Sequence, residues 1–289
     1  MIKKISRSSW DACLDTRMCD KYNNAELTLT LKIAMKQINP NYGALNGLYP
    51  NYGRTGETEK KINQWKPSQW ASWKYSFATS AQNFLNGKFW LVNNYRLLQY
   101  SYKIPTSSAN HVIEETYTPN IWCKLKIDVR DAEFSTDHHH LIEVVKLDSS
   151  ETFFGSHSNL FDNLDLNLTP KRRDSCGDRI MQRGHVHEVG HLGGLGHVNE
   201  GKPSCPKGSD TNASKCYGVD DEDLYSVMGS GMQLRKKQAD PWREAIIALL
   251  KRGVKSNPSD WEGKLKRHYP RTRAEILLNK AITIRPHRL

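Results

Sequence analysis

The chain has 289 residues, of which 37% are hydrophobic and 25% charged, and its formal net charge at pH 7 is +11. This length allows one large domain or two small ones, and 8 Trp, 12 Tyr and 7 Phe argue against a chain that is disordered throughout. No apolar run is long enough for a transmembrane helix, and the N-terminal stretch lacks the apolar region of a secretory signal peptide. The positive charge predicts affinity for anionic surfaces, but no motif for specific nucleic-acid binding is present.

The N-terminal part of the chain predicts a strand followed by a long helix. Residues 1–24 are polar and poorly periodic, so no regular element is expected there. From Leu27 to Met35 apolar residues alternate with polar or small ones, which indicates a half-buried strand. The stretch Asn39–Pro67 is rich in Asn, Gly, Pro and Tyr and predicts a long loop. Aromatic residues then recur every three or four positions between Ser68, a capping residue, and Gly87, which predicts a helix.

Short strands are predicted next, at Phe89–Val92, at Leu125–Val129 and at Leu141–Leu147. The three histidines His138–His140 precede the last of these strands. Neighbouring side chains on a strand point to opposite faces, so these histidines cannot all bind one ion, and a solvated turn is the favoured interpretation. Residues 148–175 are predicted to form a loop.

The C-terminal part predicts two helices separated by a loop and a turn. The first helix is expected from Asp178 to Gly193, followed by a polar loop over 198–224 and a turn around Met228. The second is expected from Asp240, as N-cap, to Gly253. Strand, helix and more strands followed by helices indicate an α+β fold with a mixed sheet.

The segment from His187 to His197 carries the densest set of groups that can bind a metal. On a helix, His187 and His191 lie one turn apart on the same face, so both imidazoles can reach one ion. Glu188 is rotated by about 100°, which places it beside the open coordination position. Gly194 and the glycine before it let the chain leave the helix and bring His197 to the metal. Three imidazoles leave the fourth position to water, so the pattern predicts one catalytic Zn²⁺ with Glu188 as general base.

A further histidine, His185, precedes the first predicted ligand by two residues. It lies about 200° around the helix from His187. Two interpretations remain open for it: a surface residue, or a hydrogen-bonding partner of the metal site.

The six cysteines contain no CxxC pair, so a structural zinc site built on thiolates is not expected. Short loops favour disulfides between Cys13 and Cys19 and between Cys205 and Cys216, which leaves Cys123 to pair with Cys176. Three disulfides suit an oxidising compartment. The alternative is a set of free, buried thiols in a cytosolic protein.

The pattern HExxHxxGxxH followed by a methionine turn resembles the metzincins, such as astacins, serralysins, adamalysins and matrix metalloproteases. Ser226–Gly229 resembles that turn, and the resemblance implies that Met228 forms an apolar floor beneath the three histidines. It also implies a zincin-like domain in two lobes: residues 1–197 with the sheet, the backing helix and the zinc-binding helix, and residues 198–289 with the methionine turn and C-terminal helices. Where astacins and serralysins have a tyrosine as an extra zinc ligand, this chain has Ser230.

The resemblance implies a zinc metalloendopeptidase whose extended substrate pairs with an edge strand, for which Leu141–Leu147 and Thr152–Gly155 are the candidates. We expect a bacterial effector or toxin that reaches a periplasmic or extracellular compartment without an encoded signal peptide. Its expected partners are a protein or peptide substrate and an inhibitory or delivery protein, with no specific nucleic acid and no membrane span. Two alternatives stay open: a zinc-dependent amidase on peptidoglycan, and a binding module with a non-catalytic zinc.

Overall fold

The structure is a computed structural model in which a mixed sheet carries a few helices. It describes residues 1–17, 22–41, 46–49, 59–93, 100–105, 112–152, 159–250 and 258–269, with the short pieces 271–272, 274–275 and 277–278. The α+β class predicted from the order of the elements is therefore confirmed.

Eight of the described strands form the main sheet. They are β1 (Ile2–Ser6), β2 (Asp11–Asp15), β3 (Ala25–Ile38), β6 (Phe89–Asn93), β9 (Asn120–Asp131), β10 (His140–Val145), β11 (Leu160–Asp162) and β14 (Trp261–Lys264). β3 is central: it pairs in parallel with β9 along most of its length, with β2 antiparallel over its first half and with β10 in parallel over its second half. β11 continues the sheet beyond β10, and β6 and β14 continue it beyond β9.

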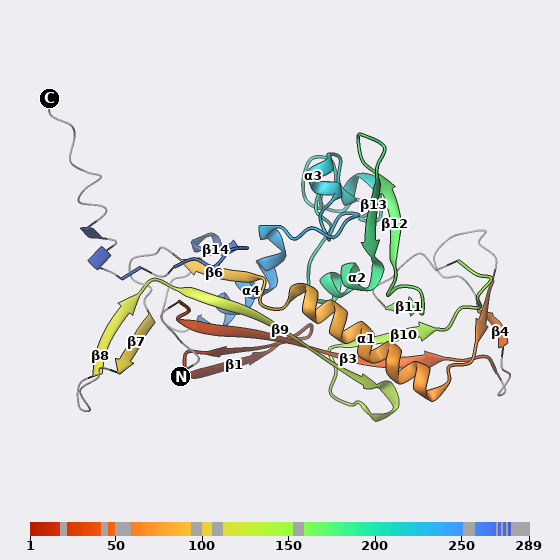
Figure 1. Ribbon diagram of the computed structural model, residues 1–289, viewed down its shortest axis with the longest axis horizontal. Coiled ribbons are helices and arrows are strands. Elements are labelled where there is room, and N and C mark those ends of the chain that lie inside the picture. The colour runs from red at the N-terminus through yellow and green to blue at the C-terminus, as the bar shows by residue number, and fades with distance from the viewer. Residues whose placement is uncertain are drawn as a thin grey trace.

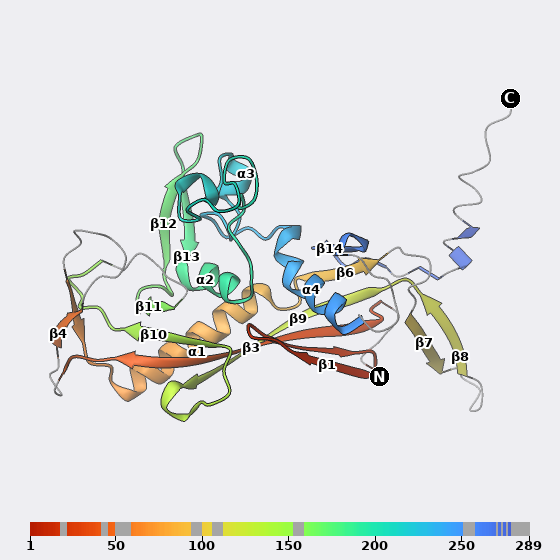
Figure 2. The same cartoon turned by 180° about the vertical axis from the view of Figure 1, so that it is seen from behind.

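Three two-stranded ribbons lie outside this sheet: β4 (Asn46–Tyr49) with β5 (Lys60–Asn63), β7 (Tyr100–Pro105) with β8 (Val112–Tyr117), and β12 (Leu168–Arg173) with β13 (Arg179–Arg183). The α-helices are α1 (Pro67–Leu85), α2 (Gly184–Leu192), α3 (Asp221–Leu224) and α4 (Asp240–Leu250). Short 3₁₀ turns occupy Ala132–Phe134, Ser214–Tyr217, Lys236–Ala239 and Pro258–Asp260. In both views α2 lies between α1 and the β12–β13 ribbon, and α3 lies beside that ribbon (Figures 1 and 2).

The alternating pattern predicted the central strand correctly. Side chains in β3 alternate between buried and half-buried, and Leu27, Leu29 and Leu31 are at most 1% exposed. The strands predicted at Phe89–Val92, Leu125–Val129 and Leu141–Leu147 correspond to β6, β9 and β10.

The N-terminal residues form an antiparallel hairpin, β1 and β2, where no regular element was predicted. Within β2 only Ala12 and Leu14 are buried, and Trp10 precedes the strand at 5% exposure. Two apolar positions are too few to distinguish a strand from a loop by periodicity. Pairing with β3 decides the structure of this segment.

The two predicted loops contain strands as well. The stretch Asn39–Pro67 includes β4 and β5, and residues 148–175 include β11 and β12. These strands have three to six residues, too few for a periodicity to be recognised. Both predictions were therefore wrong for part of their length.

Helix α1 confirms the helix predicted between Ser68 and Gly87, with its N-cap two residues earlier than predicted. It begins at Pro67, so Lys66 rather than Ser68 is the N-cap residue. Proline suits the first helical position because the amide hydrogen that it lacks would have no partner there. Gly87, at φ +69°, follows the end of the helix as predicted. The buried face consists of Trp70, Trp73, Phe77, Ala81 and Leu85.

The helix predicted over Asp178–Gly193 is a strand in its first part. Arg179–Arg183 forms β13, in which the buried residues Ile180 and Gln182 alternate with more exposed ones, and α2 begins only at Gly184. A two-residue repeat fits a strand, whereas a helix would place these two buried side chains on different faces. Pairing with β12 provides the partner that the sequence pattern does not reveal.

The last helix begins where it was predicted, although its N-terminus is formed differently. Asp240 already has helical backbone angles, φ −57° and ψ −39°, and continues directly from the 3₁₀ turn Lys236–Ala239. It is therefore a helical residue and not an N-cap. The predicted end, Gly253, lies outside the described residues.

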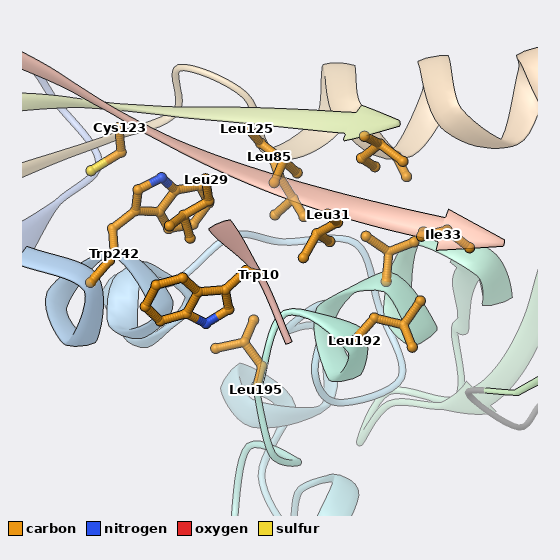
Figure 3. Close-up of a cluster of buried hydrophobic side chains, with 14 of the residues drawn as sticks. Trp10, Leu29, Leu31, Ile33, Leu85, Cys123, Leu125, Leu192, Leu195 and Trp242 are labelled. Carbon is orange, nitrogen blue, oxygen red and sulfur yellow. The ribbon is translucent and has the colours of Figure 1, made fainter. Parts of the chain in front are cut away.

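One hydrophobic core joins the sheet to both sides of the candidate metal site. In Figure 3, Leu31 and Ile33 of β3 point towards Leu192 and Leu195, which lie at the end of α2 and just beyond it. The core thereby fixes α2 against the central strand. The predicted division into lobes at residue 197 stays a prediction.

One of the three predicted disulfides is present. Cys205 and Cys216 are bonded, with both side chains fully buried. Cys123, buried in β9, and Cys176, exposed between β12 and β13, are both free, so the prediction that they pair was wrong. They belong to separate regions of the fold, and pairing by elimination could not detect this. Cys13 is free as well, and Cys19 lies outside the described residues.

Candidate metal centre

The three predicted ligands come together at the end of α2. The Nε2 atom of His191 lies 3.1 Å from Nε2 of His187 and 3.1 Å from Nε2 of His197. All three ligand atoms lie within 4.8 Å of one another. Nitrogens bound to one tetrahedral ion at 2.0–2.1 Å are separated by about 3.3 Å. The spacing therefore suits a single metal ion.

A tight turn brings the third histidine to the other two. α2 ends at Leu192, and Gly194 has φ +95°, a left-handed conformation that glycine adopts without a steric penalty. The amide of Leu195 donates to the carbonyl of Gly190 at 3.0 Å and closes the turn. The predicted exit through a glycine is thus present at Gly194.

Each histidine is oriented through its second ring nitrogen. The Nδ1 atoms of His187, His191 and His197 each lie 2.7 Å from a backbone carbonyl oxygen. The acceptors are, in that order, the carbonyls of Val227, Leu195 and Thr211. A carbonyl only accepts, so each Nδ1 carries the proton and each Nε2 presents a lone pair. Three lone pairs converging at 3.1 Å repel one another unless a cation lies between them, so this donor set fits a metal ion.

Burial keeps these imidazoles in the neutral form. It lowers the pKa of His187 well below the usual value, with a smaller contribution from His191. It also lowers the pKa of His191, and with the help of His191 it lowers the pKa of His197 to about 4. Neutral imidazole is the form that binds metals, because a protonated Nε2 has no free lone pair.

The predicted methionine turn lies directly beneath α2. Met228 is 1% exposed, and its carbonyl accepts from the amide of Val198 at 3.0 Å. A Cβ atom placed on Gly190 would lie only 2.5 Å from the sulfur of Met228. The helix and the turn can approach this closely because position 190 has no side chain.

Gln182, at the end of β13, was not predicted to support the site. Its side-chain Nε2 lies 3.1–3.2 Å from the carbonyl oxygens of Val227, Gly229 and Gly231, so the buried amide connects β13 to the methionine turn. Its Nε2 also approaches Nδ1 of His187 at 3.3 Å. Both of these nitrogens are donors, so we interpret that approach as packing and not as a hydrogen bond. Because the sequence pattern predicted a helix over Asp178–Gly193, it offered no signal for this residue.

Glu188 lines the cleft that opens onto His191 and His197. Its side chain is 4% exposed, and the cleft has a volume of about 520 Å³. His191, His197, Glu200 and Tyr217 are among the residues that line it. The predicted base and two of the three predicted ligands therefore face one cavity.

Tyr217 is the other residue that sequence reasoning missed. Its ring centroid lies 3.9 Å from that of His197 and 5.8 Å from that of His187. Burial, followed by the charge of Glu188, raises the pKa of its hydroxyl, which keeps the phenol protonated. Its position in the polar loop predicted over 198–224 offers no periodicity that would have revealed it.

His185 belongs to the core, so the interpretation as a surface residue was wrong. Its ring is fully buried, with Nδ1 2.9 Å from the carbonyl oxygen of Asp165 and Nε2 hydrogen-bonded to the hydroxyl of Ser80. Burial lowers its pKa to about 4. The residue anchors α2 to α1 and to the turn at Asp165.

The His138–His140 segment is only partly solvated. His138 is exposed, whereas His139 accepts from the amide of Lys32 at 3.0 Å and lies 3.4 Å from a carboxylate oxygen of Asp11. His140 lies 3.0 Å from the carbonyl of Ser9. These two rings attach the start of β10 to the N-terminal hairpin, which the prediction of a solvated turn did not anticipate.

The predicted substrate-binding edge differs from the observed sheet. β10 is flanked by β3 and, over Glu143–Val145, also by β11, so it is not a free edge there. The alternative segment, Thr152–Gly155, lies outside the described residues beyond Thr152.

Comparison with known proteins adds no assignment. No protein-family model, no curated protein and no solved structure matches the chain. Among the described helices, none has both the length and the apolar character needed to cross a bilayer.

Proposed function

We propose that this chain is a zinc-dependent endopeptidase of the metzincin type with a zincin-like fold. The observation that carries the proposal is the convergence of three Nε2 lone pairs, each fixed by an Nδ1 hydrogen bond, beside a cleft that Glu188, His191 and His197 line. His187, His191 and His197 would hold the ion, which supplies a polarised carbonyl and a water with a pKa near 7 when bound. The buried disulfide is compatible with the proposed delivery to an oxidising compartment.

The residues of the chain divide the remaining chemistry between them. Glu188 accepts a proton from the attacking water as the new C–O bond forms, and returns it to the amine nitrogen as the C–N bond breaks. The Nδ1 hydrogen bond to Val227 holds the ring of His187 in the orientation that aims Nε2 at the ion. Met228 and Gly190 close the site from below.

The test compares wild type with Glu188→Ala for zinc content and for cleavage of casein. We expect about one zinc ion per chain in both proteins. Cleavage should fall about 10²–10⁴-fold in the variant, the usual contribution of a positioned general base. Glu200→Ala is the matched control: Glu200 lines the same cleft but is exposed, so its removal should leave activity within a few-fold of wild type.

Two results would contradict the proposal. The absence of zinc from wild type would refute the assignment of a metal site. Full activity of Glu188→Ala would refute the assignment of Glu188 as the general base. Digestion of purified peptidoglycan in parallel separates the endopeptidase from the amidase alternative. Zinc binding without turnover of either substrate would favour a non-catalytic binding module.

A further inference from the structure

A β-bulge in the β12–β13 ribbon lies close to the metal cleft. Pro170 pairs with Met181 and Arg172 pairs with Ile180, so Lys171 is an extra residue in the register of its strand. A bulge changes the direction of side chains on its strand and increases the local twist. Here it occurs where the strand approaches the cleft residues Glu188 and Tyr217.

The two cations at the bulge have different surroundings. Burial lowers the pKa of Lys171, although the nearby acidic residues Asp165, Glu188 and Asp162 act in the opposite direction. Arg172 is half-buried, and its guanidinium carbon lies 5.4 Å from the ring centroid of Tyr217. Among the residues that the structure describes, no carboxylate forms an ion pair with Arg172.

Tyr217 connects this arginine to the metal site. Its ring contacts His197 at 3.9 Å between centroids and forms part of the cleft wall. The guanidinium of Arg172 therefore lies one side chain away from a metal ligand. A guanidinium stacked on an aromatic ring keeps its edge available for a planar, bidentate partner such as a carboxylate.

We propose that Arg172, presented by the bulge and supported by Tyr217, binds a carboxylate of the substrate, so that peptides carrying a carboxylate near the scissile bond are preferred. This inference rests on the proposed function for the identity of the bound chain as a substrate. The carboxylate can come from an acidic side chain or from the C-terminus of the peptide. Amidation of the C-terminus removes the second carboxylate and leaves the first unchanged.

The experiment measures binding, so it does not depend on turnover. Zinc-loaded Glu188→Ala protein is titrated at about 150 mM salt, where distant surface charges are screened. The probes are fluorescent pools of short degenerate peptides that differ only in one internal Glu or Gln, each prepared with a free or an amidated C-terminus. We expect one carboxylate to strengthen binding about tenfold, the factor for one charge-assisted hydrogen bond.

The controls are introduced into the same zinc-loaded protein. Arg172→Gln should reduce the preference to below about twofold, and Arg172→Lys should retain part of it, because an ammonium keeps the charge but not the bidentate geometry. Arg179→Gln removes an exposed cation from the neighbouring strand of the same ribbon and should leave the preference unchanged. Zinc content confirms that each variant retains the site.

Stronger binding of Glu pools than of Gln pools would identify a side-chain carboxylate as the preferred group. Stronger binding of pools with a free C-terminus than of amidated pools would identify the terminal carboxylate. Equal binding of acidic and neutral pools, including no measurable binding of either, would overturn the inference. So would an equal loss in Arg172→Gln and Arg179→Gln, which would indicate nonspecific attraction. Casein cleavage by wild type tests the proposed function separately. A preference for carboxylates in the binding experiment can be present or absent whether or not casein is cleaved.

Discussion

Gly190 lies on α2 between the first two histidine ligands and faces Met228. Hydrogen at this position lets the methionine sulfur reach the helix, and the helix is held in turn by Val186, Val189 and Leu192 in the core. Each ligand also depends on an acceptor for its Nδ1 proton. At the residue scale, the candidate site is therefore a set of neutral rings held by carbonyls, on a helix that packs against the sulfur of Met228.

Gly190→Ala should weaken zinc binding and lower the free energy of unfolding by about 1–3 kcal/mol. The added methyl group would lie 2.5 Å from the sulfur of Met228 and would displace the turn beneath the ligands. Zinc affinity in a metal buffer and urea unfolding measure the two effects. Combining Gly190→Ala with Met228→Ala makes room for the methyl group, so the double variant should lose less than the sum of the single variants. Strict additivity would show that the two residues do not press on each other.

At the scale of elements, α2 depends on its neighbours for stability. A helix of nine residues is not stable alone in water. β13 delivers the chain to its first residue, and His185 attaches the helix to α1 through Ser80. The methionine turn supplies the carbonyl of Val227 from the other side. A short helix can thus hold two ligands rigidly because three separate elements hold the helix.

The turn after β10 is held to β5 by one ionised side chain. Asp148 accepts hydrogen bonds from the amide and the hydroxyl of Ser150, at 3.0 and 2.8 Å, and from Nδ2 of Asn63 at 2.9 Å. These bonds lower its pKa from 3.8 to about 2. Because the folded pKa lies below the unfolded value, the stabilisation is complete above about pH 4 and is lost as the pH falls towards 2.

Asp148→Asn should therefore lower the urea midpoint at pH 5, and the difference from wild type should shrink as the pH approaches 2. Unfolding curves at several pH values in this range measure the effect. Glu133→Gln, which neutralises an exposed carboxylate, serves as the control and should show no such convergence. A difference between Asp148→Asn and wild type that stays constant across the range would mean that the ionised form is not what stabilises the turn.

At the scale of the whole molecule, segments far apart in the chain complete the candidate metal site. The ligands occupy residues 187–197, while Thr211 and Val227 supply two of the three carbonyl acceptors. The Cys205–Cys216 disulfide closes the loop that carries Thr211, and Tyr217 follows its second cysteine directly. We therefore expect oxidation of this cysteine pair to help orient His197.

Replacing both cysteines, in Cys205→Ser/Cys216→Ser, should weaken zinc binding about 10–100-fold, the usual effect of losing a partner that orients a ligand. It should also lower the free energy of unfolding by about 3 kcal/mol, as expected for a loop with a sequence separation of 11. Competition with a chromophoric chelator measures the affinity. Cys176→Ser, at an exposed free thiol, is the control and should change neither quantity. Unchanged zinc affinity in the double variant would show that the loop keeps Thr211 in place without the disulfide.

The sequence by itself determined the elements and the ligands that depend on local spacing. The alternation in β3 and the helical repeat of α1 were sufficient because each buries one continuous face. The grouping of His187, His191 and His197 was predictable for the same reason: the helix repeat and one glycine turn govern all three positions.

Only the tertiary structure decided what surrounds those ligands. Gln182, Tyr217 and Arg172 come from a strand, a 3₁₀ turn and a bulge whose positions depend on long-range packing. The hairpin β1–β2 and the boundary between β13 and α2 depend likewise on pairing partners distant in sequence. Local periodicity carries no information about such partners, because a backbone hydrogen bond across a sheet or a carbonyl beneath an imidazole belongs to no repeating pattern.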